Sequence, residues 1–274
     1  MPEFSFTDKD FKNISERVYQ ACGIVLGPHK REMVYSRLAK RLRFYGFTQF
    51  NQYLDYLDGN NDEEFSNFIN AITTNLTAFY REKHHFDFLE KVLLPKLLKD
   101  NASTRKIRIW SAGCSTGEEP YSIAMSVAKI CPRSGWDIKI LATDLDSNVL
   151  ATAQQGVYNQ RQIDGIPDNL VQQWFLKSKH GDQLKVKPGL QKYITFKRLN
   201  LLEPWPMKGK FDVIFCRNVV IYFDKTTKEY LYDQFANRLA NHGHLFLGHS
   251  ESMGKDQHQF HNLGKTMYAK AHHS

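Results

Sequence analysis

Between Ile107 and Ser122 the chain reads IRIWSAGCSTGEEPYS, the pattern of a strand, a glycine turn and a helix. Apolar residues that alternate with polar ones at its start predict the strand. Small residues follow, with glycines at Gly113 and Gly117, and a pair of glutamates then begins the helix. Pro120 is tolerated in the first helical turn because an N–H there has no partner within the helix. This order of elements is typical of a nucleotide-binding unit.

The two glutamates, Glu118 and Glu119, bear on which ligand the turn holds. A phosphate site favours positive character at the start of a helix, and here two carboxylates stand in that place. We therefore expect a ligand with hydroxyls and a positive charge. S-adenosylmethionine fits, since it is an adenosine that carries a sulfonium and an ammonium and no phosphate. The turn lacks the G-x-G-x-x-G pattern of dinucleotide sites, and packing alone would also explain its glycines.

The composition is that of an ordinary globular protein. The chain has 274 residues, 42% of them apolar and 24% charged, enough for one large or two modest domains. It has no apolar run of membrane-spanning length, and its start lacks the pattern of a signal peptide. The four cysteines show no C-x-x-C spacing, so we expect no metal site and a reducing cytoplasm. The net charge of +8 favours an acidic partner, although solubility explains it equally.

Apolar periodicity divides the chain into a helical part and an α/β part. Helices are predicted over residues 11–22, 30–45, 50–57 and 63–73. After these, strands are predicted over 106–110, 137–142, 211–216 and 244–247. Helices over 118–130, 148–155 and 225–240 separate these strands. Strands and helices in alternation predict a mostly parallel sheet with helices on its faces.

Residues 156–196 break this alternation. The segment contains several glycines and prolines among short alternating stretches such as 184–186 and 193–196. It is too long for a plain loop in a compact domain. We therefore predict an inserted subdomain with a helix near residues 169–175 and a short antiparallel sheet. Insertions at the ligand-facing edge of such folds often carry partner recognition.

Polar residues follow two of the predicted strands. Asp144 ends the strand after the glycine turn, where an acidic residue can accept both ribose hydroxyls of an adenosine. The alternative is a helix cap, which Asp146 could equally supply. Arg217 and Asn218 end the apolar strand 211–216, and this pair is expected to face the ligand crevice. Tyr222 follows, and for a tyrosine taken alone a core position is the ordinary explanation.

Two further groups of polar residues admit a functional and a plain interpretation. Asn75, Thr77 and Arg81 are spaced to project from one segment, yet helix capping and solvation explain them equally. The second predicted helix carries a basic cluster, of which Arg37, Lys40 and Arg41 fall largely away from the apolar face, and a solvated surface is its usual explanation. An acidic partner is the alternative for this cluster, which consists of Lys30, Arg31, Arg37, Lys40, Arg41 and Arg43.

Together these motifs resemble the chemotaxis receptor methyltransferases of the CheR type. The resemblance covers nearly the whole chain. Six motifs occur in the order and at the spacing of that family: N-x-T-x-F-[FY]-R-E at 75–82, S-A-x-x-S-T-G-E-E-P-Y-S at 111–122, A-T-D-[IL]-D at 142–146, N-L-L-E at 200–203, F-D-x-I-F-C-R-N-V-x-I-Y-F at 211–223 and G-H-S-E at 248–251. Any one of them could arise by chance, but six in order make coincidence very improbable.

The resemblance implies a fold and an activity. The fold is a class I S-adenosylmethionine-dependent methyltransferase, Rossmann-like, with a helical domain at residues 1–76, a linker at 77–90 and the methyltransferase domain at 91–274. Residues of about 156–196 form the inserted antiparallel β-subdomain. The implied activity is methylation of glutamate side chains on the cytoplasmic helical bundle of chemoreceptors. S-adenosylhomocysteine is then the product, and we expect a cytoplasmic monomer without a metal or a nucleic-acid partner.

The resemblance also implies roles for single residues. Arg81 and Tyr222 would lie nearest the methyl group, and Arg37, Lys40 and Arg41 would face the acidic receptor. For Glu118 two roles stay open, contact with the ligand or support of the loop. In some members of the family the β-subdomain grips a peptide at the receptor's C-terminus, and here the sequence does not decide this. The cofactor contacts would be Asn75, Thr77, Arg81, Glu118, Asp144, Asn200, Leu201, Arg217 and Asn218.

Two other functions compete with this interpretation. A protein that binds S-adenosylmethionine as a signalling adaptor would keep the fold without transferring a methyl group, and the intact Arg81 and Tyr222 argue against it. The positive net charge suggests a nucleic-acid methyltransferase. Against this, Arg217-Asn218-Val219 stands where such enzymes carry an N-P-P-[YF] motif, and few aromatic residues accompany the basic cluster.

Overall fold

The structure is a computed structural model that describes residues 3–59, 61–132, 134–178, 181–254 and 257–271. The chain forms two compact units. The first contains Met1–Thr74 and Tyr222–Lys228, and the second contains Asn75–Ile221 and Glu229–Ser274. Within the described part of the chain, no helix combines the length and the apolar character needed to cross a membrane.

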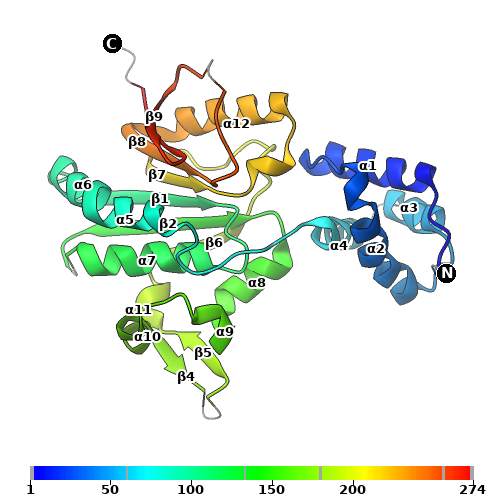
Figure 1. The fold of residues 1–274 in the computed structure, drawn as a ribbon, viewed down its shortest axis with the longest axis horizontal. Coiled ribbons are helices and arrows are strands. Elements are labelled where there is room, and N and C mark those ends of the chain that lie inside the picture. The colour runs from blue at the N-terminus through cyan, green and yellow to red at the C-terminus, as the bar shows by residue number, and fades with distance from the viewer. Residues whose placement is uncertain (1–2, 60, 133, 179–180, 255–256, 272–274) are drawn as a thin grey trace. The chain divides into compact units, whose positions relative to one another are not determined.

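The first unit is helical (Figure 1), with α1 (Asp8–Cys22), η1 (Pro28–Lys30), α2 (Arg31–Tyr45), α3 (Phe50–Asp58) and α4 (Asp62–Ile72). Local signals set the helix ends. Thr7 caps α1, because its hydroxyl accepts the N–H of Asp10 while the Asp10 carboxylate accepts the N–H of Thr7. Gly46 ends α2 at a φ of +73°, a conformation that a side chain would strain. The four predicted helices are therefore present, with small shifts at their ends.

A buried carboxylate ties the helices of the first unit together. Glu64 on α4 is 1% exposed and accepts a hydrogen bond from Arg41 Nε at 2.9 Å. The hydroxyls of Tyr53 and Tyr45 donate to the same carboxylate at 2.6 and 2.8 Å. Burial raises the pKa of Glu64, but these donors outweigh it and the net pKa lies below the ordinary value. The charged form of Glu64 therefore stabilises the folded unit.

The second unit is centred on a seven-stranded sheet in the order β6-β2-β1-β7-β8-β10-β9. Strands β6, β2, β1, β7 and β8 run parallel, whereas β10 and β9 run antiparallel to their neighbours. All residues of β7 are buried, as expected for a central strand covered on both faces. The predicted mostly parallel sheet is confirmed. Its strands are β1 (Lys106–Ala112), β2 (Asp137–Asp144), β6 (Ile194–Arg198), β7 (Phe211–Cys216), β8 (Leu239–Leu247), β9 (Phe260–Gly264) and β10 (Met267–Lys270).

Helices cover this sheet. They are α7 (Glu118–Ile130), α8 (Ser147–Gln155), α12 (Lys225–Arg238) and a continuous helical run of α5 (Lys83–Phe88), the π-helix η2 (Leu89–Leu93) and α6 (Leu94–Asp100). A short 3₁₀ helix, η3 (Val220–Tyr222), precedes α12 in the chain. The apolar core joins this run to β1, α7 and β7. The run contributes Phe86, Leu89, Leu93, Leu94 and Leu97, all of them buried.

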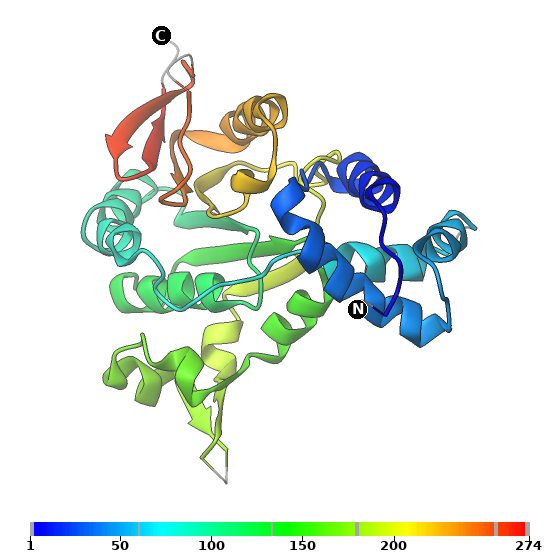
Figure 2. The same ribbon diagram turned by 45° about the vertical axis from the view of Figure 1, so that its right-hand side comes forward.

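The inserted subdomain has its own antiparallel sheet in the order β3-β5-β4. Figure 1 and Figure 2 both show it projecting away from the seven-stranded sheet, below α7 and α8. This confirms the small antiparallel sheet that we predicted. Its elements are β3 (Val157–Asn159), α9 (Gln160–Ile163), α10 (Asp168–Trp174), β4 (Phe175–Lys177), β5 (Gln183–Val186) and α11 (Pro188–Gln191).

Two boundary predictions are corrected, and part of the expected linker has a structure that we did not predict. Residues 194–196, which we placed in the inserted sheet, belong to β6 and pair in parallel with β2. Residues 239–240, which we placed in a helix, begin β8. From Lys83 onward the expected linker 77–90 is helical, and its buried Phe86 and Leu89 belong to the core of the second unit. In each case long-range packing determines the secondary structure, and the local pattern of apolar residues does not predict it. The division at residues 76 and 90 stays a prediction.

The contacts of Glu64 predict how the first unit responds to acid. Because the folded state lowers the pKa of Glu64, its stabilising effect is complete above the unfolded pKa of about 4.3 and is lost as the pH falls further. We expect Glu64→Gln to lower the unfolding free energy at pH 7 by roughly 3 kcal/mol, since it leaves Arg41 without its partner.

Hydrogen–deuterium exchange of α2–α4 at pH 7 measures the loss of stability in Glu64→Gln. The same measurement at pH 4 shows how much stability the wild type loses in acid. The control is Glu63→Gln, which changes the exposed neighbouring residue and should alter exchange little. Equal protection of the wild type and Glu64→Gln at pH 7 would contradict the prediction.

Candidate functional site

Parallel pairing brings the predicted site residues of the second unit to one edge of the sheet. Because β6, β2, β1 and β7 are parallel neighbours, their carboxyl ends lie at the same edge. Open α/β sheets bind ligands in the crevice outside this edge. Five predicted contacts meet here, since Asp144 ends β2, Asn200 and Leu201 follow β6, and Arg217 and Asn218 follow β7.

The glycine turn between β1 and α7 is packed tightly against its surroundings. Gly113 and Gly117 have φ angles of +102° and +100°. A Cβ on Gly113 would lie 2.3 Å from Val219 Cγ2, and one on Gly117 would lie 2.8 Å from the Tyr158 hydroxyl. Packing therefore requires both glycines, in agreement with the alternative explanation that packing alone accounts for them.

Three backbone N–H groups of this turn are already bonded. Those of Gly113 and Cys114 donate to the carbonyl of Thr143 at 2.8 and 2.9 Å. That of Ser115 donates to Asp144 Oδ2 at 2.8 Å. A phosphate site needs such N–H groups to point at the ligand. These three groups therefore do not serve a phosphate, in agreement with the two glutamates that follow the turn.

Asp144 does not cap helix α8, the alternative role that we considered for it. Asp146 caps α8, because its side chain accepts the N–H groups of Asn148 and Val149. The Asp144 carboxylate instead accepts the N–H groups of Ser115 and Asp146 at 2.8 and 3.0 Å. Burial raises the pKa of Asp144 to about 6, although these hydrogen bonds oppose the change. Its remaining lone pairs suit hydroxyl donors.

Asn75 ties the start of the second unit to the glycine turn. Its side-chain amide donates to Asp146 Oδ2 at 2.8 Å, and its carbonyl accepts the Ser115 hydroxyl at 2.8 Å. Thr77 follows two residues later and is partly exposed. The segment that carries Asn75, Thr77 and Arg81 therefore begins at the edge of the sheet where Asp144 lies.

Glu118 supports the loop in the described contacts. Its carboxylate accepts the Thr116 hydroxyl at 2.7 Å and lies 3.5 Å from the side-chain amide of Gln162 in the inserted subdomain. Glu118 is 3% exposed, and burial raises its pKa. Of the two roles left open by the sequence, these contacts fit loop support. Contact with a ligand stays a prediction.

Asn200 and Leu201 continue from β6 beside Asp144, whose carbonyl accepts the N–H of Leu199 at 2.9 Å. Asn200 Oδ1 accepts the N–H of Leu202 at 3.1 Å, and Leu201 is buried. This turn therefore brings an amide and an apolar side chain to the edge of the sheet, a pair that suits an adenine or a ribose.

Arg217 is the centre of a buried ionic network that the sequence did not reveal. Its guanidinium lies 3.3 Å from Glu119 Oε2 and 3.5 Å from Glu82 Oε2, and it donates to the carbonyl of Arg81. Its Nε has no hydrogen-bond partner among the described residues. Glu82 and Glu119 belong to the N-x-T-x-F-[FY]-R-E and S-T-G-E-E motifs, but the sequence does not show that both lie beside Arg217.

The loop that begins at Asn218 is held by a second residue that we did not predict. Asn218 has a φ of +59°, and its N–H donates to Glu251 Oε2 at 2.8 Å. The same carboxylate accepts the N–H groups of Gly248 and Ile221. A Cβ on Gly248 would lie 2.4 Å from the Asn218 amide. The G-H-S-E motif was the signal for this clamp.

The two predicted catalytic residues fall in different units. Arg81 belongs to the second unit, is partly exposed, and donates to the carbonyl of Leu76 at 2.9 Å. Tyr222 belongs to the first, where its carbonyl accepts the N–H of Val25 at 2.8 Å. Their joint position at a methyl group stays a prediction.

The predicted partner residues have different surroundings. Arg37 donates to the carbonyls of Ala71 and Ile72 at the end of α4, and Arg41 pairs with buried Glu64. Lys40 is exposed. Arg37 and Arg41 therefore also stabilise the first unit. The helical projection did not reveal this role.

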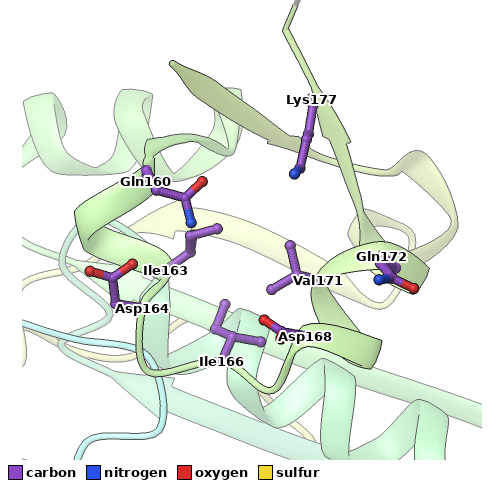
Figure 3. A pocket seen from close by; sticks show the side chains of 8 residues that line it. All are labelled: Gln160, Ile163, Asp164, Ile166, Asp168, Val171, Gln172 and Lys177. Carbon is purple, nitrogen blue, oxygen red and sulfur yellow. The ribbon is translucent and has the colours of Figure 1, made fainter. Parts of the chain in front are cut away.

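Two other features could hold ligands. Donor atoms of Glu82, His84 and His85 lie within 4.8 Å of one another, close enough for a metal ion. In the inserted subdomain a pocket of about 360 Å³ lies between α9, α10 and β4. Figure 3 shows Gln160 and Lys177 pointing into it above Ile163, Ile166 and Val171.

Two family descriptions match the chain. "CheR methyltransferase, all-alpha domain" matches residues 9–73, and "CheR methyltransferase, SAM binding domain" matches residues 75–269. A chemotaxis protein methyltransferase of Escherichia coli is 42% identical over 97% of this chain and 92% of its own length. One of Salmonella typhimurium is 42% identical over 97% and 91%. A probable chemotaxis protein methyltransferase of Rhizobium etli is 41% identical over 92% and 96%.

The position of Asp144 predicts a pH-dependent contribution to binding. We expect Asp144→Asn to weaken the affinity for S-adenosylhomocysteine about 30-fold, since hydrogen bonds to a charged group contribute roughly 2 kcal/mol. The carboxylate is the better acceptor, so wild-type affinity should hold above pH 7 and fall as the pH drops through about 6. Asparagine does not titrate, so the variant should lack this decrease.

Calorimetric titration between pH 5 and 8 measures both effects. Asp137→Asn is the matched control, because it changes a carboxylate at the opposite end of the same strand. Unchanged affinity in Asp144→Asn would contradict the assignment to ribose.

Proposed function

This chain belongs to the CheR methyltransferase family, and from this premise we propose that it transfers a methyl group to glutamate carboxylates of chemotaxis receptors. S-adenosylmethionine-dependent methyl transfer in chemotaxis follows from the family and from the relatives' names. The glutamate acceptor and the receptor bundle are the proposed parts. The observation that carries the proposal is that both family domains match in order, over residues 9–73 and 75–269.

The residues at the edge of the sheet fit S-adenosylmethionine. The N–H groups of Gly113, Cys114 and Ser115 in the glycine turn are bonded within the protein, and the Asp144 carboxylate can accept hydroxyls. When bound, the cofactor supplies a methyl group activated by a sulfonium, and it leaves as S-adenosylhomocysteine. We assign the binding to Asn75, Thr77, Arg81, Glu118, Asp144, Asn200, Leu201, Arg217 and Asn218.

The proposed acceptor explains why the site needs no general base. A glutamate side chain is already ionised at neutral pH, so its oxygen can attack without losing a proton. In-line displacement then requires positioning and the exclusion of water. In this proposal Arg81 orients the incoming carboxylate, and Tyr222 packs beside the sulfonium.

The partner surface is proposed to lie on α2. Lys40 is exposed, and the net charge of +8 favours an acidic receptor bundle. Arg37 and Arg41 would add to the same positive field while they hold the first unit. We propose that the enzyme acts as a cytoplasmic monomer. The pocket of the inserted subdomain offers a place for a receptor peptide, so receptors with and without their C-terminal tails should be compared.

A methylation assay tests the acceptor. With labelled S-adenosylmethionine and receptor-containing membranes, we expect label on the receptor that alkali releases as methanol, as an ester requires. Label that resists alkali would exclude a glutamate ester. Cofactor binding without any transfer would favour the adaptor, and salt-sensitive binding to duplex DNA or RNA would favour a nucleic-acid substrate.

Arg81 should affect turnover more than binding. We expect Arg81→Ala to lower kcat at least 100-fold, because the incoming carboxylate loses the charged group that orients it. Affinity for S-adenosylhomocysteine should change less than tenfold. Lys83→Ala is the control, since it removes an exposed positive charge two residues away. A kcat for Arg81→Ala close to that of the control would exclude the proposed role.

A further inference from the structure

The backbone around Arg81 is held in an unusual conformation. Tyr80 and Glu82 lie on either side of it and have positive φ angles of 53° and 56°. Residues with a Cβ rarely adopt this conformation, and they keep it only where the surrounding contacts impose it. The direction in which the chain presents the Arg81 side chain therefore depends on those contacts.

Each of the three residues is held by a different part of the second unit. The N–H of Tyr80 donates to Ser122 Oγ on α7 at 3.0 Å. The carbonyl of Arg81 accepts a hydrogen bond from Arg217, at the end of β7. Glu82 Oε1 accepts the N–H of His249 at 3.1 Å and lies 3.0 Å from its Nδ1.

Arg217 joins these contacts. Its side chain is 2% exposed and lies between the carboxylates of Glu82 and Glu119. Glu119 is in turn anchored, since it accepts the hydroxyl of Ser111 on β1 at 2.7 Å. The network thus connects β1, α7 and the end of β7 to the strained residues 80–82.

The geometry of the network pairs Arg217 with Glu82. The Glu82 side chain is 9% exposed, and its Oε2 lies 3.5 Å from the guanidinium of Arg217. Its other oxygen, Oε1, accepts the N–H of His249. Arg217 is therefore the buried cation that the Glu82 carboxylate faces.

We infer that Glu82 is a positioning residue: its buried ion pair with Arg217, braced by Glu119 and His249, fixes the strained backbone that aims Arg81. The inference rests on the proposed function, in which Arg81 orients the carboxylate of the receptor. Glu82 of the N-x-T-x-F-[FY]-R-E motif and His249 of the G-H-S-E motif then share one task, which is to hold this backbone. Neither Glu82 nor His249 needs to touch the substrate.

The test is a double-mutant cycle in the methylation assay. Glu82→Gln keeps the size of the side chain and removes its charge. We expect it to lower kcat at least tenfold and to change affinity for S-adenosylhomocysteine less than threefold. If Glu82 acts through Arg81, the same substitution should lower kcat no further in an Arg81→Ala background. A general loss of structure would instead lower kcat by the same factor in both backgrounds, and that result would overturn the inference.

Hydrogen–deuterium exchange gives a readout that does not depend on methylation. Exchange of residues 78–82 should rise in Glu82→Gln and stay unchanged in Asp87→Asn. The control is matched, because Asp87 lies in α5 and its carboxylate pairs with the exposed Lys91, at 3.8 Å from its Nζ. Unchanged exchange in Glu82→Gln would overturn the inference even if the receptor proves not to be the substrate.

A milder variant covers the case in which Glu82→Gln does not fold. His249 has a side chain that is 65% exposed, so His249→Ala should fold while it loses the contact between Nδ1 and Glu82. We expect a threefold to tenfold loss of kcat that is also absent in the Arg81→Ala background. Wild-type kcat in His249→Ala together with unchanged exchange at 78–82 would count against the network.

Discussion

The parallel pairing of β6, β2, β1 and β7 is the constraint on which the site depends. It places the ends of four strands at one edge, so residues far apart in sequence, Asp144, Asn200 and Arg217 among them, lie at the same edge of the sheet. Side chains on separate elements can form a site only if the sheet fixes their relative positions. The buried apolar strands, β7 above all, provide that rigidity.

Some local conformations at the edge of the sheet are unusual. Ser115 and Asn218 have positive φ angles in the turns that follow β1 and β7, as Tyr80 and Glu82 do in the segment before α5. Each is held by a buried acceptor or donor, such as the carboxylates of Asp144 and Glu251. Carboxylates thus brace the loops at this edge by accepting their backbone N–H groups.

Much of this could be predicted from the sequence. The alternation of strands and helices, the inserted sheet and the residues that end the strands follow from periodicity, and the motif order indicates the family. The roles of Arg37 and Arg41 could not be predicted, because a helical projection shows which way a residue faces but not the α4 carbonyls and Glu64 that it meets. The helices after Lys83 were missed because the core of the second unit, and not a strong local pattern, holds them.

By itself the sequence determined the class of fold, the family and the residue types available to the cofactor, since these depend on local order and on spacing. Only the tertiary structure decided how those residues are used. It showed that Asp146 rather than Asp144 caps α8, that Glu118 accepts the hydroxyl of Thr116 in the loop before α7, and that Glu82, Glu119 and Arg217 form one network. The reason is that a hydrogen bond or an ion pair depends on distances of a few ångströms between distant segments, and packing alone sets those distances.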